Sequence, residues 1–324
     1  MDLSTISRPV DGELKEFRRF FRDSMHSKML LLDTVVRYIL RQKGKQARPI
    51  LVLLSAAVAG GISRRTYVAA TMVELLHTAT LVHDDVVDEA DERRSFPSIN
   101  AVWKNKVAVL VGDYLLSRGL LVAVEYDEFG FLKITSDAVR RMSEGELLQI
   151  QKSRQLDIRE EEYFRIISDK TASLIGTCCK LGAASASDDP VTAEAFQRYG
   201  EMVGIAFQIR DDIFDYSENS GVTGKPTGND LKEKKLTLPL IHSIANAPRS
   251  ESKKILKMIK KGEESEERSR LVREFVTQYG GLVYAERTAI EYCERAREAI
   301  APFPDSPAKR SLLGFVEFAL TRDA

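Results

Sequence analysis

Two clusters of aspartates are the residues of this sequence whose types and spacing could do chemistry. Both have the pattern DDxxD, and they are Asp84-Asp85-Val-Val-Asp88 and Asp211-Asp212-Ile-Phe-Asp215. A spacing of four residues places the first and last carboxylates of each cluster on one helix face, where like charges repel. Hard divalent cations bind several carboxylate oxygens, and Mg²⁺ typically shares its coordination shell with water and substrate phosphates. The clusters therefore predict a magnesium site.

The segments before the two clusters share a pattern. Each is an apolar helical segment with one polar stripe, which begins at Glu74 in the first and at Glu201 in the second, at the same offset from the aspartates. Such a stripe is typical of a buried helix that faces an internal cavity. Two such helices facing each other would bring six carboxylates to one mouth, which is unstable without metal ions. The alternative is two surface helix ends with solvated acids, and the repetition disfavours it.

Basic residues near the clusters could bind the anion that a metal site attracts. Arg93 and Arg94 follow the first cluster by about a turn and a half. Lys45 and Arg48 lie at a glycine turn before a helix, where free N–H groups and the helix dipole favour an anion. Further candidates, which solvation or a hydrogen bond in the core would also explain, are Lys170 with Thr171, Lys225, Lys235 and His77.

Helical periodicity dominates the elements that must position these residues. Apolar residues, 44% of the 324, recur at three- and four-residue spacing, and strict alternation is rare. Long helices are expected over residues 136–151, 157–181 and 192–216. No Gly/Ser linker or shift in composition divides the chain. The sequence predicts an all-α, single-domain bundle of ten or more helices over residues 1–324, around a deep central cavity.

Composition limits the partners and the setting. The charges balance, 48 basic against 48 acidic, so no nucleic-acid or strongly anionic membrane partner is expected. Three cysteines, including adjacent Cys178 and Cys179, cannot form a disulfide framework, which favours a reduced, cytoplasmic setting. The apolar run 50–62 is shorter than the roughly 20 residues that span a bilayer. The first thirty residues lack an apolar signal core, so we expect no transmembrane segment.

Together these residues resemble the trans-polyprenyl diphosphate synthases, the head-to-tail isoprenoid synthases. The matching segments are GKQARP (44–49), ELLHTATLVHDDVVDEADERR (74–94), GDYLLS (112–117), DKTASL (169–174), FQIRDDIFDY (207–216), GK (224–225) and KKLTLPL (234–240). The resemblance implies the isoprenoid synthase fold and a homodimer. It also implies that isopentenyl diphosphate condenses with an allylic diphosphate, such as farnesyl or geranylgeranyl diphosphate. Mg²⁺-assisted ionisation, alkylation and proton loss would add one trans isoprene unit.

The resemblance also implies roles for individual residues. Asp84 and Asp88 would hold two Mg²⁺ ions on the allylic diphosphate and Asp211 a third, with Asp85, Asp212 and Asp215 completing the metal-binding clusters. The residues that would bind the allylic diphosphate are Arg93, Lys170 and Lys235, with Lys225 close by. The isopentenyl diphosphate site would contain Lys45, Arg48, His77 and Arg94. Gln208 and Thr171 would lie against the developing cation. One departure is Ser95, where the family usually has glycine.

Product length is expected to depend on the helix before the first cluster. Thr80 and Ala79, four and five residues before Asp84, lie about 6 to 7.5 Å along the helix axis. Short-chain relatives place a bulky side chain at this depth, whereas both residues here are small. We therefore hypothesise a long product of the octaprenyl class, used as a quinone side chain. Close packing of a neighbouring helix is the alternative explanation.

Three other functions stay open at this point. A short-chain farnesyl or geranylgeranyl diphosphate synthase would have the same motifs. A class I terpene cyclase resembles the first cluster, but the second DDxxD and the basic residues disfavour it. A non-catalytic subunit of a heteromeric synthase should have lost aspartates, and this chain keeps all six.

Overall fold

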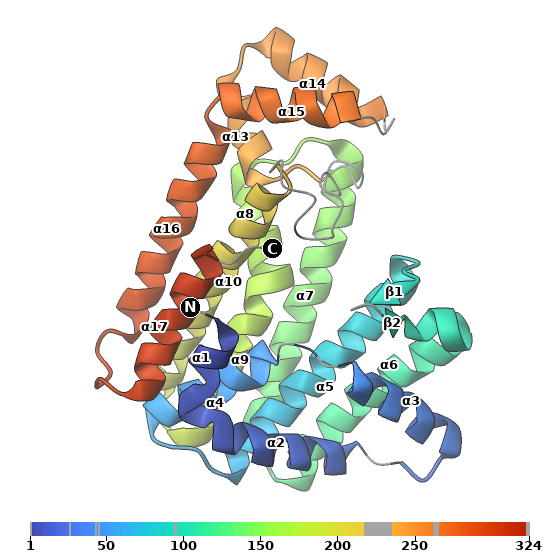
Figure 1. The fold of residues 1–324 in the computed structure, drawn as a ribbon, viewed down its shortest axis with the longest axis vertical. Helices are drawn as coiled ribbons and strands as arrows, with labels where there is room; N and C mark the ends of the chain where they lie inside the picture. Colours follow the sequence, from blue (N-terminus) through green and yellow to red (C-terminus); the bar gives the residue numbers. More distant parts are fainter. Residues whose placement is uncertain are drawn as a thin grey trace.

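The computed structural model describes residues 2–25, 27–42, 44, 46–93, 96–216, 235–261 and 266–321. In these ranges the chain is a bundle of helices, and its strands are β1 (Glu92–Arg93) and β2 (Phe96–Pro97), which pair antiparallel (Figure 1). The predicted all-α fold with ten or more helices is confirmed.

The helices fall into three groups along the chain. The N-terminal elements are α1 (Leu3–Ser7), the 3₁₀ turn η1 (Arg8–Val10), α2 (Asp11–Ser24), α3 (Leu30–Arg41) and α4 (Ala47–Ala59). The central elements are α5 (Arg64–Val87), α6 (Ile99–Glu125), α7 (Phe129–Gln155), α8 (Glu160–Ile167), the π-helical turn η2 (Ser168–Ala172), α9 (Ser173–Ala186) and α10 (Pro190–Phe214). The C-terminal elements are α13 (Leu238–Asn246), α14 (Arg249–Lys261), α15 (Glu266–Gln278), α16 (Gly281–Ile300) and α17 (Pro307–Thr321).

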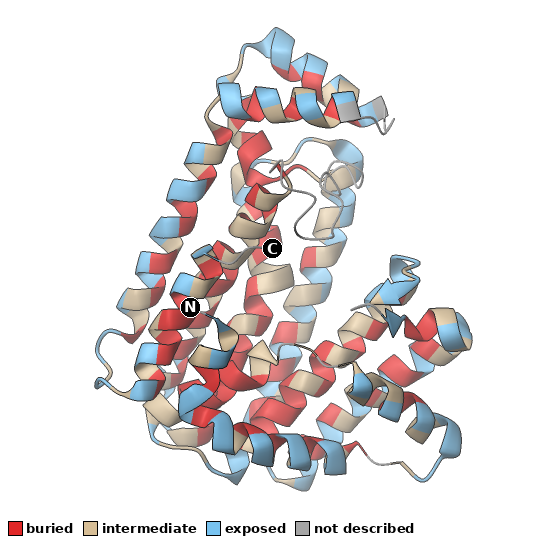
Figure 2. Cartoon of the chain, in the orientation of Figure 1, coloured by how far each residue is buried: buried red, intermediate tan, exposed pale blue. Residues whose placement is uncertain are grey.

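The core lies where α4, α5, α9 and α10 pack together. Figure 2 shows buried residues gathered along these helices and exposed residues on the outer faces of α14 and α15. Glycines let the central helices approach closely, since a Cβ added at Gly182 of α9 would lie 2.3 Å from the carbonyl oxygen of Val52 in α4. α10 and α16 contribute to both clusters of buried apolar residues in the described chain. These contacts fix the helices that carry the acidic clusters.

The helix expected over residues 157–181 differs in one respect. It is divided into α8 and α9 by the π-helical turn η2. A π-turn inserts one extra residue and so rotates the faces before and after it relative to each other. Apolar periodicity tolerates this shift, and the sequence therefore did not reveal it. Lys170 and Thr171, two polar residues inside an apolar segment, mark the place.

α6 has two unexpected features. Lys104 has a φ of 71° inside the helix, which kinks it. The helix is also long and apolar enough to cross a membrane, with a mean hydropathy of 1.8 over its most apolar window, of which 39% is buried. Several large apolar side chains of α6 are exposed, among them Val109, Leu110, Leu120 and Leu121. Length and composition thus leave this helix as a candidate span that the sequence expectation had not considered.

Candidate active site

Each aspartate cluster forms the last turn of its helix. Asp88 and Asp215 are the C-cap residues of α5 and α10, and their N–H groups donate to the carbonyl oxygens of Asp84 and Asp211 at 2.8 and 3.3 Å. The C-terminal end of a helix carries the negative pole of the helix dipole, so carboxylates there are unfavourable. The aspartates therefore do not stabilise their helices, and both helix ends favour a bound cation.

The middle aspartate of each cluster is buried and held by protein donors. Asp85 is 2% exposed and accepts a hydrogen bond from Arg93 Nε at 2.5 Å. Asp212 is 4% exposed and accepts hydrogen bonds from the Tyr163 hydroxyl at 2.6 Å and from Gln208 Nε2 at 2.9 Å. The first and last aspartates are more accessible, because Asp84 and Asp88 are exposed and Asp211 and Asp215 are half-buried. Each cluster thus has one fixed carboxylate between two accessible ones.

A short hairpin brings Arg93 back to the end of α5. Strands β1 and β2 pair, and the Tyr38 hydroxyl donates to the carbonyl oxygen of Pro97 at 2.7 Å, which ties the hairpin to α3. Arg93 can therefore reach Asp85, eight residues earlier. Three other basic residues of the predicted site, Lys45, Arg94 and Lys225, lie outside the described residues, as does Ser95.

A cavity of about 230 Å³ lies between α7, α8, η2 and α10. Its polar lining includes five of the predicted site residues or their partners, namely Lys170, Thr171, Gln208, Asp212 and Lys235. Ile166, Ile167 and Leu236 supply an apolar wall. The Thr171 hydroxyl donates to Gln208 Oε1 at 3.0 Å, so that a chain of hydrogen bonds runs from η2 through Gln208 and Asp212 to Tyr163.

Lys170 links this cavity to the first aspartate cluster. Its Nζ lies 2.5 Å from Glu146 Oε2 and 3.4 Å from Gln149 Oε1 on α7. Burial, followed by the charges of Asp88 and Glu146, raises the pKa of Asp84, and the charges of Lys170 and Arg93 oppose that rise. The same ammonium group therefore lines the cavity beside Asp212 and acts on Asp84, so that the two acidic helix ends flank η2.

Burial also raises the pKa of Asp85, although the hydrogen bond and the charge of Arg93 lower it. Two neighbouring carboxylates at the end of α5 are thus held in surroundings that disfavour their charge. A bound divalent cation would relieve this cost, because it adds the positive charge that the site lacks.

A second cavity, of about 380 Å³, lies between α2, α3 and α5. It is lined by Glu74, His77, Leu81, Asp85 and Arg93, together with Arg18 and Arg22 of α2. His77 is buried, and Arg48 is half-buried in the first turn of α4, just after Gln46, which lines the cavity. At this cavity the predicted residues of α5 therefore lie near the N-terminal end of α4.

The polar residues of the two helices line cavities as follows. Glu74, His77 and Asp85 of α5 line the second cavity, whereas Gln208 and Asp212 of α10 line the first. Glu201 is bound by Arg141 of α7 at 2.5 Å. The single mouth expected for the six carboxylates stays a prediction.

The described residues contain no group of three acidic, histidine or cysteine side chains that could hold a metal ion alone. Mg²⁺ is commonly bound by one or two carboxylates plus substrate phosphates, so a complete protein cage is not required. The accessible Asp84, Asp88 and Asp211, at helix ends that favour cations, fit such shared coordination.

The two small residues expected to control product length lie in different surroundings. Ala79 is 1% exposed and belongs to the main core, and Thr80 is half-buried with its hydroxyl bonded to the carbonyl oxygen of His77. Neither lines the two cavities. Farther along the face of Thr80, Leu76 and Met72 border a gap of about 20 Å³ against α6 and α7.

Three residues near the site were missed from the sequence. Tyr163 gave no signal beyond being one more aromatic residue on an apolar helix face. Glu146 and Gln149, which contact Lys170, are three residues apart in a segment correctly predicted to be helical. Their spacing indicated a shared face, but nothing in the sequence indicated which residue that face would meet.

An all-α bundle with two acidic helix ends, fixed cations and an apolar cavity wall defines the class of isoprenoid synthases. A family model described as Polyprenyl synthetase matches residues 30–276. The chain is 37% identical over 318 residues to an all-trans-nonaprenyl-diphosphate synthase (geranyl-diphosphate specific) of Rhodobacter capsulatus, which covers 98% of this chain and 97% of the relative. It is 32% identical over 323 residues to the octaprenyl diphosphate synthase of Escherichia coli (strain K12), with 100% of both chains covered.

A solved structure agrees with these relatives. The polyprenyl synthase of Caulobacter crescentus CB15, complexed with calcium and isoprenyl diphosphate, superposes with a TM-score of 0.89 at 33% identity, covering 100% of this chain and 98% of that one. The chain therefore belongs to the polyprenyl synthetase family and is a prenyltransferase, as the resemblance implied. Enzymes of this family generally depend on divalent metal ions.

Proposed function

We propose that this prenyltransferase condenses isopentenyl diphosphate with an allylic diphosphate, of the farnesyl or geranylgeranyl kind, to a long-chain all-trans polyprenyl diphosphate that becomes a quinone side chain. The observation that carries the proposal is the pair of DDxxD helix ends that flank Lys170 at an apolar-walled cavity. The relatives named for nonaprenyl and octaprenyl products support the long chain.

The allylic diphosphate would bind at the mouth of the first cavity. Asp84 and Asp88 would hold two Mg²⁺ ions and Asp211 a third. When bound, these ions neutralise the diphosphate and make it a better leaving group. Arg93, Lys170 and Lys235 would bind its oxygens and stabilise the charge that develops as it leaves. The Caulobacter structure is a complex with calcium and isoprenyl diphosphate, which supports the use of a divalent ion together with a diphosphate.

The lining of the first cavity suits a carbocation. Ile166, Ile167 and Leu236 would exclude water, which would otherwise capture the cation. Gln208 is held at both ends, by Thr171 and by Asp212, so its carbonyl dipole is oriented before substrate binds. The fixed dipole lowers the barrier because it need not reorganise during the reaction.

Isopentenyl diphosphate would bind in the second cavity. His77 lines it, Arg48 lies beside it, and Lys45 and Arg94 are expected to complete its cationic set. The Asp85–Arg93 pair also lines this cavity, so it lies between the two substrates. This arrangement would place the isopentenyl double bond near the allylic carbon.

The test is a product assay with the purified chain, farnesyl diphosphate, isopentenyl diphosphate and Mg²⁺, followed by chromatography of the dephosphorylated products. We expect a long-chain series that needs both isopentenyl diphosphate and Mg²⁺ and stops on chelation with EDTA. Products of 15 or 20 carbons only would indicate a short-chain synthase. Hydrocarbon formed without isopentenyl diphosphate would indicate a terpene cyclase, and activity only after addition of a second subunit would indicate a partner subunit.

We also infer that the chain is a homodimer that uses the exposed apolar face of α6. Val109, Leu110, Leu120 and Leu121 on this face are exposed, and large apolar patches usually mark an interface. Asp113 and Arg118 lie on the same helix, which favours a protein partner over a bilayer. Sedimentation analysis should give twice the chain mass, and a Leu110→Glu, Leu121→Glu variant should sediment as a monomer.

We further infer a single domain over residues 1–324 and a cytoplasmic setting without nucleic-acid partners. α10 and α16 contribute to both buried clusters, which supports one cooperative unit. The three cysteines are free and buried, as a reducing compartment would allow. One cooperative transition in calorimetry is expected, and two separate transitions would contradict the single domain.

A further inference from the structure

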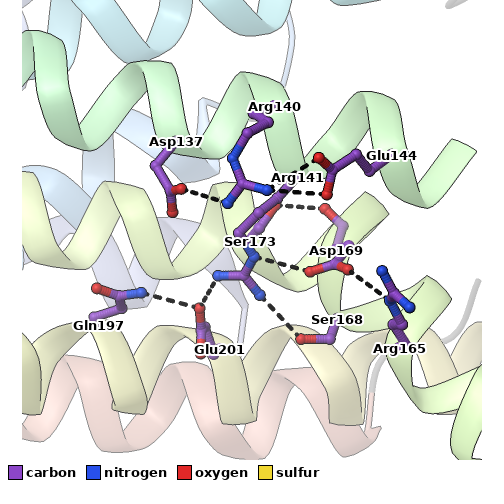
Figure 3. A network of polar contacts seen from close by, with 10 residues as sticks. All are labelled: Asp137, Arg140, Arg141, Glu144, Arg165, Ser168, Asp169, Ser173, Gln197 and Glu201. Carbon is purple, nitrogen blue, oxygen red and sulfur yellow. Dashed lines mark hydrogen bonds and ion pairs between the residues drawn. The ribbon is translucent and has the colours of Figure 1, made fainter.

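Arg141 of α7 connects three segments of the chain. Its Nε donates to Asp169 Oδ1 at 2.8 Å, its Nη1 to Glu201 Oε1 at 2.5 Å and its Nη2 to Ser168 Oγ at 3.1 Å (Figure 3). Asp169 and Ser168 belong to the π-turn η2, and Glu201 belongs to α10. The guanidinium group thus uses its forked geometry to bind η2 and α10 at once, which a lysine could not reproduce.

Neighbouring residues of the π-turn have different surroundings. Ser168 and Asp169 point toward Arg141, whereas Lys170 and Thr171, the next two residues, line the first cavity. A π-turn is a local departure from the regular helix that needs support from its surroundings. The contacts of Ser168 and Asp169 therefore bear directly on where Lys170 and Thr171 lie.

Two glycines show how closely η2 is enclosed. A Cβ added at Gly145 of α7 would lie 2.9 Å from the backbone nitrogen of Lys170, and one added at Gly204 of α10 would lie 2.6 Å from Cα of Ala172. Gly145 is one turn after Arg141, on the same face of α7. The backbone of η2 is thus held between two helices, and the ion pairs of Arg141 with Asp169 and Glu201 add to that contact.

The charged side chains around Arg141 are largely shielded from water. Arg141, Asp169 and Glu201 have side chains that are 19%, 17% and 19% exposed. Glu201 also accepts a hydrogen bond from Gln197 Nε2 at 3.1 Å. Removing Arg141 leaves Glu201 partly buried without this counter-charge and leaves Asp169 with Arg165 Nε at 3.8 Å, so the contact between η2 and α10 through the guanidinium is lost.

We propose that Arg141 is a positioning residue that holds the π-turn and thereby orients Lys170 and Thr171 toward the cavity. What those two residues do rests on the proposed function, whereas the support of the π-turn by Arg141 does not. A displacement of about 1 Å in a substrate-binding group can cost about 10²-fold in rate. Loss of Arg141 should therefore lower turnover without removing any group that touches substrate.

The neighbouring residue supplies a matched control. Arg140 is 57% exposed, and its partners, Asp137 and Glu144, lie on α7 itself. Arg140→Ala removes the same side chain from the same helix but breaks no contact between segments. Arg141→Lys keeps a charge in case Arg141→Ala does not fold. Tyr199→Phe, which loses the hydrogen bond from the Tyr199 hydroxyl to the carbonyl oxygen of Leu312, is a control for lost stability, because that bond joins α10 to α17 and does not involve η2.

Steady-state assays with farnesyl and isopentenyl diphosphates give the first readout. Arg141→Ala should lower kcat by about 10- to 100-fold, and Arg141→Lys should lower it less. KM for isopentenyl diphosphate should change little, because neither Arg141 nor any of its three partners lines the cavity proposed for it. Arg140→Ala and Tyr199→Phe should retain wild-type kcat well below their melting temperatures. Wild-type kcat in both Arg141 variants, or an equal loss in Tyr199→Phe, would overturn the proposal.

Hydrogen exchange gives a readout that does not need activity. Amides of residues 168–173 should exchange faster in Arg141→Ala than in Arg140→Ala, with little change elsewhere in α9. Faster exchange there in a protein that makes no prenyl product would support the positioning role while the proposed function fails. Unchanged exchange together with a normal product series would support the function and overturn the positioning role.

Discussion

The two aspartate clusters have the same pattern but different supports. In α5 the buried middle aspartate, Asp85, is held by one cation, Arg93, delivered by a short hairpin. In α10 the corresponding Asp212 accepts hydrogen bonds from two neutral donors of the described part of the chain, Tyr163 and Gln208. The first support is electrostatic and depends on pH and charge. The second is a hydrogen-bond network and depends on geometry.

Their surroundings differ as well. Asp84 and Asp88 are exposed at the end of α5, whereas Asp211 and Asp215 are half-buried at the end of α10. Lys170 lines the first cavity together with Asp212, and its charge opposes the rise in the pKa of Asp84. The comparison suggests that the first cluster mainly binds metal, and that the second also organises the cavity through Gln208 and Thr171.

The largest difference should appear in activity. Asp84→Asn should lower kcat/KM by about 10³-fold or more, and Asp211→Asn by about 10²-fold. The reason is that Asp84, with Asp88, would hold two ions, whereas Asp211 would hold one. Product formation at saturating Mg²⁺ measures both. Equal losses in the two variants would remove the proposed difference between the clusters.

The supports should differ in stability. Arg93→Met leaves buried Asp85 without its cation and should cost about 2–3 kcal/mol of unfolding free energy at neutral pH. Tyr163→Phe leaves Asp212 with the Gln208 donor and should cost about 1 kcal/mol. Urea unfolding without Mg²⁺ measures both, with Arg140→Ala as a surface control.

The pH dependence separates the two supports further. Loss of Arg93 raises the folded-state pKa of Asp85 further above its unfolded value of 3.8, so the folded protein binds more protons. The deficit of Arg93→Met should therefore shrink as the pH falls toward 4, whereas that of Tyr163→Phe should stay nearly constant. A deficit of Arg93→Met that grows on acidification would contradict the electrostatic support.

A smaller effect is expected from Asp84 itself. Partial desolvation of its carboxylate and the charges of Asp88 and Glu146 raise its folded-state pKa, so its charge opposes folding at neutral pH, and this cost disappears as the pH falls through that pKa. Asp84→Asn should stabilise the metal-free protein by about 0.5 kcal/mol, a small value because the residue is exposed and screened. Thermal unfolding in EDTA measures it, and destabilisation by this change would contradict the raised pKa.

The least effect on rate is expected from a change that alters product length. Thr80→Phe should shorten the products, because a large side chain would block the face of α5 toward Leu76, yet leave the first condensation intact. Chromatography of the dephosphorylated products measures the series. The matched change Ala79→Phe should instead destabilise the protein, since Ala79 is packed in the core. An unchanged product series in Thr80→Phe would show that this face of α5 does not control product length.

Much of the fold could be predicted because it depends on local patterns. Helix periodicity extends over consecutive residues, and four-residue spacing within a cluster defines a helix face without further information. The family resemblance then assigned roles to Lys170, Thr171 and Gln208, and the structure places all three around one cavity. Predictions for Lys45, Arg94 and Lys225 lie outside the described residues.

By itself, the sequence determined the helical class, the two acidic helix ends and the need for cations near them, since each follows from residue types a few positions apart. Only the tertiary structure decided that Tyr163 meets Asp212, that Arg141 binds η2 and α10, and that Lys170 and Gln208 line the same cavity. The physical reason is that these contacts join residues tens of positions apart. Helix packing, which local spacing does not encode, selects which faces meet.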